Sequence, residues 1–118
     1  MTPSKPAHHE INYIEFTVTD LQIAKDFYSQ AFDWEFTDYG PTYVGIKKND
    51  NEFGGFSLET MVKKGGPLVI LYSDKVEDSL ELVKEAGGKI SKDIFDFPGG
   101  KRFEFLDPFG NELGVWSK

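Results

Sequence analysis

The first half of the chain changes from a two-residue hydrophobic period to a helical one and back. Residues 11–19 alternate between apolar and polar side chains, which predicts a half-buried strand. Residues 21–32 carry apolar side chains at helical spacing behind Asp20, a candidate N-cap. Three short strands are expected next, over 34–38, 43–47 and 56–61, separated by Tyr39-Gly40-Pro41, Asn49-Asp50-Asn51 and Gly54-Gly55. The predicted order is βαβββ.

The second half repeats this order. Residues 68–72 predict an apolar strand, and Asp74 is the candidate N-cap of a second helix that ends at Gly87-Gly88. Three further strands are expected over 89–95, 101–106 and 112–116, with Asp107-Pro108-Phe109-Gly110 as the turn between the last two.

The two halves are expected to form one domain, because 118 residues leave no room for a second. Leu21 falls on Val76, and this offset of 55 residues also places Gly55 on Gly110. We therefore predict an α+β fold of two βαβββ modules, at about 11–62 and 67–118, behind a loose leader over 1–10.

Alternation in the last predicted hairpin separates its side chains into two faces. Phe103 and Phe105 are expected to face the helices, with the residues between them on the other side. The opposite face then carries Tyr13, Glu15, Thr17, Arg102, Glu104, Leu106, Glu112, Gly114 and Trp116. The charges fit a solvated sheet equally well, but Tyr13 and Trp116 favour a ligand pocket.

The amino-acid composition disfavours several classes of binding partner and of chemistry. Twenty Asp and Glu against thirteen Lys and Arg give a net charge of −7, which disfavours nucleic acid and anionic membranes. The absence of cysteine excludes thiolate metal sites and thiol catalysis. No apolar run approaches about 18 residues and residues 1–10 hold no apolar signal segment, so we expect a cytoplasmic protein without a membrane span.

Two short segments carry a family resemblance. The first, from Ile14 to Phe32, contains Val18-Thr19-Asp20-Leu21 and then Phe27-Tyr28, and the second is Asp107-Pro108-Phe109-Gly110-Asn111. In this order they resemble the vicinal oxygen chelate superfamily of glyoxalase I, extradiol dioxygenases, and fosfomycin and bleomycin resistance proteins. The chain is most similar to the small glyoxalase-related proteins. The resemblance implies a curved mixed-sheet cup with the helices on its convex face and a ligand inside.

Enzymes of this family hold a divalent metal in the cup with ligands from the first and last strand of each module. Carried over by motif, those positions are Tyr13, Glu59, Leu68 and Gly114, of which only Glu59 is a strong ligand. Zinc, iron, nickel and manganese need about three or more nitrogen or oxygen ligands from the protein. We therefore expect a degenerate metal site and no cofactor.

Few other residues are candidates for catalysis or for ligand binding. Glu15, Glu104 or Glu112 could act as a general base if burial raised its pKa, and Arg102 could clamp an anionic group, although each is equally compatible with a solvated strand. His8-His9 is the only histidine pair and is expected to be a solvated part of the leader.

Three functions remain open. The first is a metal-independent protein that binds a small molecule, with a cationic ligand suiting the acidic chain. The second is a lyase or isomerase-like enzyme, in particular a glyoxalase-related lyase that acts without the usual metal, and the third is a non-catalytic interaction module. The resemblance also implies a homodimer. The predicted ligand-binding residues are Tyr13, Glu15, Glu59, Leu68, Arg102, Glu104, Glu112, Gly114 and Trp116.

Overall fold

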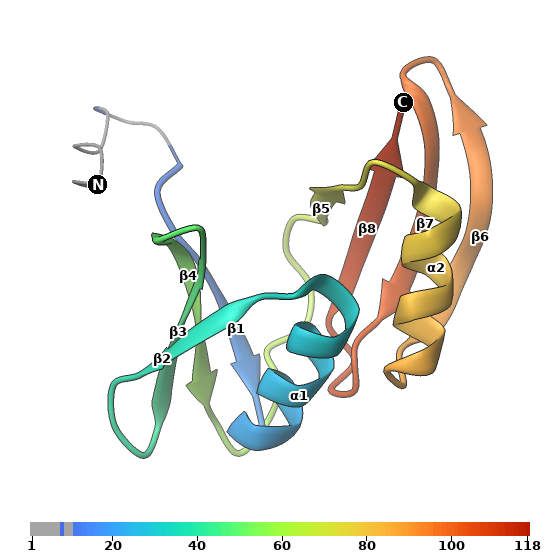
Figure 1. Ribbon diagram of the computed structural model, residues 1–118. Coiled ribbons are helices and arrows are strands. Elements are labelled where there is room, and N and C mark those ends of the chain that lie inside the picture. The colour runs from blue at the N-terminus through green and yellow to red at the C-terminus, as the bar shows by residue number, and fades with distance from the viewer. Residues whose placement is uncertain (1–7, 9–10) are drawn as a thin grey trace.

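The computed structural model describes residue 8 and residues 11–118, so most of the predicted leader lies outside the described part of the chain. Each module follows the predicted βαβββ order (Figure 1). The first module contains β1 (Ile14–Val18), α1 (Leu21–Phe32), β2 (Glu35–Asp38), β3 (Tyr43–Lys48) and β4 (Asn51–Leu58). The second contains β5 (Val69–Tyr72), α2 (Val76–Glu85), β6 (Lys89–Phe97), β7 (Gly100–Leu106) and β8 (Glu112–Ser117).

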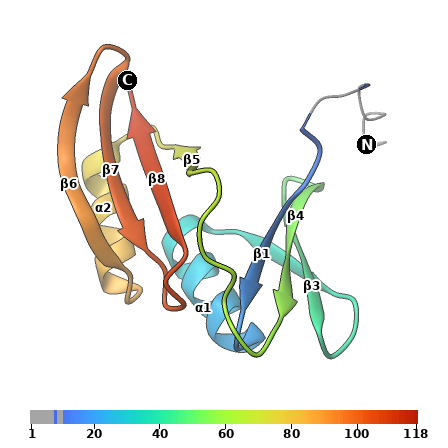
Figure 2. The ribbon, with the colours of Figure 1, turned by 180° about the vertical axis from the view of Figure 1, so that it is seen from behind.

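The strands belong to two mixed four-stranded sheets, one in each module (Figure 2). Sheet 1 has the order β1-β4-β3-β2 and sheet 2 the order β5-β8-β7-β6. The first and last strand of each module pair in parallel, and the remaining neighbours pair antiparallel. The two-module α+β prediction is therefore confirmed, and β1 and β5 are each left at the edge of a sheet.

One hydrophobic core joins the modules. Phe27 and Tyr28 of α1 are buried, and the ring of Phe27 lies 6.1 Å from the ring of Phe105 in β7. Phe103 and Phe105 are fully buried, as their alternation predicts. Each helix covers the core-facing side of its sheet, and we call the other side of each sheet its open face. Aromatic burial of this size dominates the energetics of a small core.

The two helices begin differently. Asp20 caps α1 as predicted, because its Oδ1 accepts from the Ile23 amide over 2.9 Å. The prediction of Asp74 as the cap of α2 is wrong: the N-cap is Lys75, which makes no side-chain cap bond. Ser73 is the polar residue of this turn, since its Oγ accepts from the Lys75 amide at 3.0 Å and the helix starts one residue later.

The predicted boundary at Gly54-Gly55 is also wrong. Both glycines lie inside β4, and the turn before it is made at Asn49 and Asp50, which have positive φ angles. A Cβ on Gly54 would collide with the carbonyl oxygen of Ile14 in the neighbouring strand, so the sheet requires glycine there.

The longer β4 changes the alignment of the modules. Ile14 pairs with Gly54, and Val69 pairs with Leu113. The offset is therefore 55 residues in the first strand of each module but 59 in the last, because 113 minus 54 is 59. Gly114 consequently corresponds to Gly55, not to Glu59.

Candidate functional site

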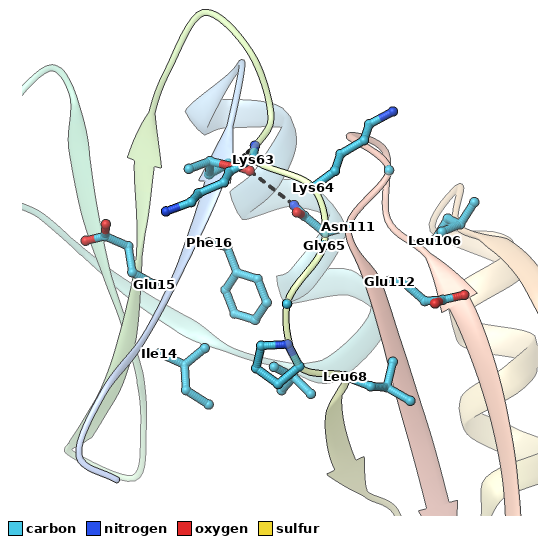
Figure 3. A pocket seen from close by; sticks show the side chains of 15 residues that line it. Ile14, Glu15, Phe16, Lys63, Lys64, Gly65, Leu68, Leu106, Asn111 and Glu112 are labelled. Atoms are coloured by element: carbon cyan, nitrogen blue, oxygen red, sulfur yellow. Dashed lines mark hydrogen bonds between the residues drawn. The ribbon is translucent and has the colours of Figure 1, made fainter.

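A cavity of about 810 Å³ lies between the modules, at the edge strands β1 and β5 (Figure 3). Its walls come from β1, from the connection between β4 and β5, and from the turn that leads into β8. The lining residues are Ile14, Glu15, Phe16, Thr17, Lys63, Lys64, Gly65, Gly66, Pro67, Leu68, Val69, Leu106, Gly110, Asn111 and Glu112. Segments from both modules are thus required to form it.

Thr17 in β1 connects two walls of the cavity to this strand through hydrogen bonds. Its Oγ1 accepts a hydrogen bond from the backbone amide of Lys63 over 2.7 Å, which ties the connecting segment to sheet 1. Its carbonyl oxygen accepts from Nδ2 of Asn111 over 3.1 Å, which ties the second module to the same residue. One threonine therefore fixes two of the three walls.

Asn111 is in turn positioned by the buried carboxylate of Asp107. Oδ1 of Asp107 accepts from the amides of Phe109 and Asn111, and Oδ2 accepts from the Asn111 side chain and from the hydroxyl of Tyr28. Burial raises the pKa of Tyr28 well above its usual range, and the negative charge of Asp107 adds to this effect. The phenol therefore remains a donor at neutral pH.

The interior of the cavity is apolar and its charges lie at the rim. Phe16 and Ile14 point from β1 toward the middle, Leu68 extends away from Phe16 toward sheet 2, and Glu15 and Glu112 point outward on opposite sides (Figure 3). Lys63 and Lys64 extend from the connecting segment. Such a cavity can hold an apolar group and contact a charged substituent at its mouth.

A second polar arrangement occupies the open face of sheet 1. The hydroxyls of Tyr39 and Tyr13 donate to the carboxylate of Glu52 over 2.7 and 3.4 Å, and Tyr43 donates to Tyr13 over 3.0 Å. Gly55 lies beneath them, where a Cβ would reach the hydroxyls of Tyr43 and Tyr13.

The environment of these tyrosines disfavours their ionised form. Desolvation is the largest cause that raises the pKa of Tyr13 and of Tyr43, and the hydrogen bond to Glu52 is the largest cause that raises the pKa of Tyr39. All three phenols are therefore neutral at physiological pH, and the negative charge of this face comes from its carboxylates.

The open face of sheet 2 is aromatic. The ring of Trp116 meets Tyr72 edge to face at 5.0 Å and Phe97 at 6.1 Å. Beside it Nη2 of Arg102 lies 3.0 Å from the carboxylate of Glu104. The predicted residues Arg102, Glu104, Gly114 and Trp116 lie together on this face.

The nine predicted ligand-binding residues are thus divided among several places. Glu15, Leu68 and Glu112 line the cavity, and the four residues just named share the open face of sheet 2. Tyr13 belongs to the network on sheet 1.

Glu59 lies apart from the other eight. It follows the end of β4, where its amide donates to the carbonyl of Val18 and its carboxylate accepts from Ser57. The parallel register places it about 20 Å from Tyr13, at about 3.3 Å per residue along the strand. Tyr13 and Glu59 are two of the four positions aligned with metal ligands, and they therefore lie too far apart to bind one ion.

The residues do not fit the divalent metal that the fold family implies. In structural register, the positions from the four strands are Tyr13, Gly55, Leu68 and Gly114, and none of these side chains is a carboxylate or imidazole. Within residue 8 and residues 11–118, no three His, Cys, Asp or Glu side chains gather as a metal site. A tyrosine with a raised pKa is a poor ligand, since the phenolate must form first.

Sequence reasoning did not identify Thr17, Asn111 and Lys63 as neighbours in one site. The hydrogen bond between Asn111 and Thr17 joins residues 94 positions apart, so no local pattern could reveal it. No helix in the described residues is both long and apolar enough to cross a membrane.

Curated relatives match the chain at modest identity. The protein named "Putative glyoxylase CFP32" in Mycobacterium bovis and in Mycobacterium tuberculosis is 25% identical over 115 residues. The match covers 89% of this chain but 44% of the relative, so the chain spans less than half the length of these proteins.

Solved structures share the fold. A glyoxalase/bleomycin resistance protein/dioxygenase family enzyme from Burkholderia phytofirmans has a TM-score of 0.77 at 16% identity, with 90% of this chain and 96% of that one covered. A glyoxalase-related enzyme from Fulvimarina pelagi has a TM-score of 0.77 at 18% identity, with 94% and 89% covered. TnmS3, an antibiotic binding protein from Streptomyces sp. CB03234, has a TM-score of 0.69 at 19% identity, with 96% and 98% covered.

The sequence itself matches a family model over residues 10–115, which is nearly the whole chain. The paired βαβββ modules agree with this match at the level of topology. The chain therefore belongs to the Glyoxalase/Bleomycin resistance protein/Dioxygenase superfamily.

Proposed function

We propose that this protein binds a small organic molecule without a metal, and that the ligand enters the cavity between the modules. The observation that carries this proposal is the cavity itself, whose volume of about 810 Å³ lies in the range of ligand pockets, ~300–1,000 Å³. The similarity in fold to TnmS3, named as an antibiotic binding protein, supports the same class of function.

We expect different lining residues to contact the apolar part and the charged part of the ligand. Ile14, Phe16 and Leu68 provide the apolar walls, and Glu15 and Glu112 lie at opposite sides of the mouth. A ligand with an apolar body and a positive charge can contact these carboxylates, although Lys63 and Lys64 on the connecting segment offset their charge. The net charge of −7 favours the approach of such a cation from solution.

An enzyme is the second candidate, and the name of the CFP32 relatives favours it. A lyase or isomerase of this kind would act without the usual metal and would use Glu15 or Glu112 as the general base. The two carboxylates point away from each other, which favours simple binding over a paired acid–base mechanism (Figure 3).

We propose further that the chain acts in the cytoplasm as a homodimer, in which the open faces of the sheets form the cup. Large side chains remain exposed on those faces, including Tyr39 at 59% and Tyr72 at 52%. Exposed aromatic side chains are enriched where protein surfaces associate. Light scattering at micromolar concentration tests this, and a mass of 13.4 kDa would contradict it.

The experiment for binding uses benzyltrimethylammonium as a cationic probe and benzyl alcohol as its neutral counterpart. In calorimetric titrations we expect the cation to bind more tightly, and the Glu15→Gln/Glu112→Gln double variant to remove this preference. Glu59→Gln is the matched control, because Glu59 lies outside the cavity lining. Failure of both probes to bind, or an unchanged preference in the double variant, would contradict the proposal.

Metal dependence is measured on the same samples. We expect the purified protein to retain no stoichiometric transition metal and to bind the cation equally well after treatment with EDTA. Turnover of 2-oxoaldehyde–thiol adducts would favour the enzyme. If instead neither probe binds and the protein captures a protein partner, the interaction module is favoured.

A further inference from the structure

The strand β1 has a free edge that faces the cavity. It is an edge strand of sheet 1, with β4 on one side. Asn111 reaches the other side from the second module, because its Nδ2 donates to the carbonyl oxygen of Thr17 over 3.1 Å. The free edge of β1 is therefore directed toward the second module, across the cavity that both modules line.

The backbone of Glu15 belongs to this free edge. In a parallel pair, alternate residues direct both their amide and their carbonyl toward the neighbouring strand. The carbonyl of Val18 accepts from the Glu59 amide over 2.9 Å on the side of β4, so the backbone groups of Val18 and Phe16 face β4. The amide and carbonyl of Glu15 consequently face the other way, together with those of Thr17.

Asn111 occupies one hydrogen-bonding position of this edge and leaves the next one open. Its side-chain amide bonds to Thr17 in the place where an added strand would present a backbone N–H. Glu15 lies two residues earlier, about 6.6 Å along the strand, and within residue 8 and residues 11–118 its amide and carbonyl have no protein partner. A chain that adds beside Glu15 would therefore continue the ladder that Asn111 begins.

The space beside Glu15 is accessible and has apolar walls. Glu15 is exposed, and its neighbours Ile14 and Phe16 are half-buried with side chains that point toward the middle of the cavity (Figure 3). The connecting segment opposite contains Gly65 and Gly66, at which an added Cβ would meet no atom of the described residues within 4 Å. An extended chain beside β1 would thus find apolar surface for its side chains.

The mouth of the cavity carries charges of both signs. Glu15 and Glu112 contribute carboxylates, and Lys63 and Lys64 contribute ammonium groups. A short peptide with free ends likewise has an ammonium group at one end and a carboxylate at the other. Its ends are therefore complementary to the whole set of charges, whereas a simple cation is complementary to the two carboxylates only.

We infer that the ligand of the cavity is a short linear peptide that adds as a strand to the free edge of β1. Its backbone exchanges hydrogen bonds with the amide and carbonyl of Glu15, and its apolar side chains pack on Ile14 and Phe16. Main-chain bonds supply the affinity in such strand addition, and pockets for alternate side chains supply the specificity. This inference rests on the proposed function, since it uses the same cavity, and it names the chemical class of the ligand.

The probe is the tetrapeptide Ala-Phe-Val-Ala, compared with two analogues that are N-methylated at its phenylalanine or at its valine. Successive amides of an extended chain point to opposite sides, so one of these two N–H groups faces β1 and the other faces away. In calorimetric titrations we expect one analogue to bind at least about tenfold more weakly than the parent, and the other to bind within about threefold of it. Equal losses in both analogues, or no loss in either, would overturn the inference.

A pair of protein variants tests the same bond from the other side. Glu15→Pro removes the amide donor, and proline is tolerated where the N–H of an edge strand points away from the sheet. Glu15→Gln is the matched control, because it removes the same charge and keeps the amide. We expect Glu15→Pro to bind the tetrapeptide about fivefold to tenfold more weakly than Glu15→Gln, and to bind benzyltrimethylammonium as Glu15→Gln does. Equal binding of the tetrapeptide by the two variants would contradict the inference.

Hydrogen exchange in the unmodified protein gives a readout that needs no variant. With saturating tetrapeptide, the Glu15 amide should exchange at least about tenfold more slowly, whereas the Phe16 amide, which faces β4, should keep its rate. An unchanged rate at Glu15 would overturn the inference. Protection of Glu15 in the peptide-free homodimer would also overturn it, because a second copy would then already cover the edge.

The two proposals fail separately. Binding of benzyltrimethylammonium without binding of the tetrapeptide at millimolar concentration would overturn the peptide and leave the proposed function standing. Binding of the tetrapeptide alone would support strand addition and contradict the simple cation.

Discussion

The hydroxyl of Tyr28 donates to Oδ2 of Asp107 over 2.9 Å in the interior of the protein, and this bond joins α1 of the first module to the turn before β8 of the second. Asp107 is 5% exposed and also receives the side chain of Asn111. The side chain of Asn111 in turn donates a hydrogen bond to the carbonyl of Thr17 in the cavity wall. One buried carboxylate therefore links the core to the shape of the candidate site.

Removal of the Tyr28 hydroxyl should weaken the whole domain. Tyr28→Phe keeps the ring, which stacks on Trp34 at 4.7 Å, but leaves a buried carboxylate with one donor fewer. We expect a loss of about 1–3 kcal/mol in the free energy of unfolding, measured by urea titration. Tyr39→Phe, at an exposed position, should cost less than about 0.5 kcal/mol. Equal effects of the two substitutions would contradict the role given to Asp107.

The same pair predicts how stability depends on pH. The pKa of Tyr28 is raised in the folded state from its usual value of 10.0, so below that pH both states keep the proton. As the pH rises above 10, the unfolded chain loses this proton while the folded protein retains it, and stability falls. The deficit of Tyr28→Phe relative to the unmodified protein should therefore shrink by up to about 1.4 kcal/mol per pH unit. Urea titrations between pH 8 and pH 11 measure it, and a constant difference would contradict the prediction.

Patterns along the chain predict those features that depend on neighbouring residues. The alternation around Phe103 and Phe105 correctly assigns the buried face of β7, and the Asp20 cap is found as expected. Gly54-Gly55 was assigned to a turn because glycine is most common there. In the structure the Ile14 carbonyl requires glycine at position 54, and Gly55 lies beneath two tyrosine hydroxyls, contacts that a sequence pattern does not display.

The candidate site depends even more on distant residues. A constant offset of 55 residues aligned Glu59 with Gly114, but the four extra residues between the first and last strand of the second module place Gly55 there instead. The predicted single cup is divided because Glu15 and Glu112 reach the cavity while Arg102 and Trp116 lie on the open face of sheet 2. Glu112 and Trp116 lie on the same face of β8, so it is their distance along the strand that places them in different surroundings.

The two adjacent glycines of β4 should respond differently to alanine. A Cβ at Gly54 meets the backbone oxygen of Ile14, which cannot move without disturbing the ladder between β1 and β4, so Gly54→Ala should cost about 1–3 kcal/mol or more. A Cβ at Gly55 meets the ends of two tyrosine side chains, which can rotate away. Gly55→Ala should therefore cost less than about 1 kcal/mol and instead lower the pKa of Tyr43 in a titration followed by ultraviolet absorbance. The reverse order of stabilities would contradict this account.

The uncapped start of α2 offers a stabilising substitution. Lys75 has the extended backbone of an N-cap but its side chain accepts no amide hydrogen. Lys75→Ser should raise the free energy of unfolding by roughly 0.5–1 kcal/mol, and Asp20→Ala at the capped helix should lower it by about 0.5–2 kcal/mol. Thermal or urea unfolding of the two variants tests the pair. A loss of stability in Lys75→Ser would show that Ser73 already completes the cap.

The segment over the cavity should depend on Thr17. Thr17→Val keeps the volume of the side chain but removes the acceptor of the Lys63 amide, and with it a hydrogen bond that ties this segment to β1. Opening of the segment should become easier by about 1 kcal/mol, which corresponds to roughly fivefold faster cleavage when opening is rapid. The rate of trypsin cleavage measures this opening, because trypsin cuts after lysine and both Lys63 and Lys64 lie in the segment. Ser57→Ala, which removes a bond to Glu59 only, is the matched control and should be cleaved at the original rate. If Thr17→Val were cleaved no faster, the bond from the Lys63 amide to Thr17 would not be what holds the segment against β1.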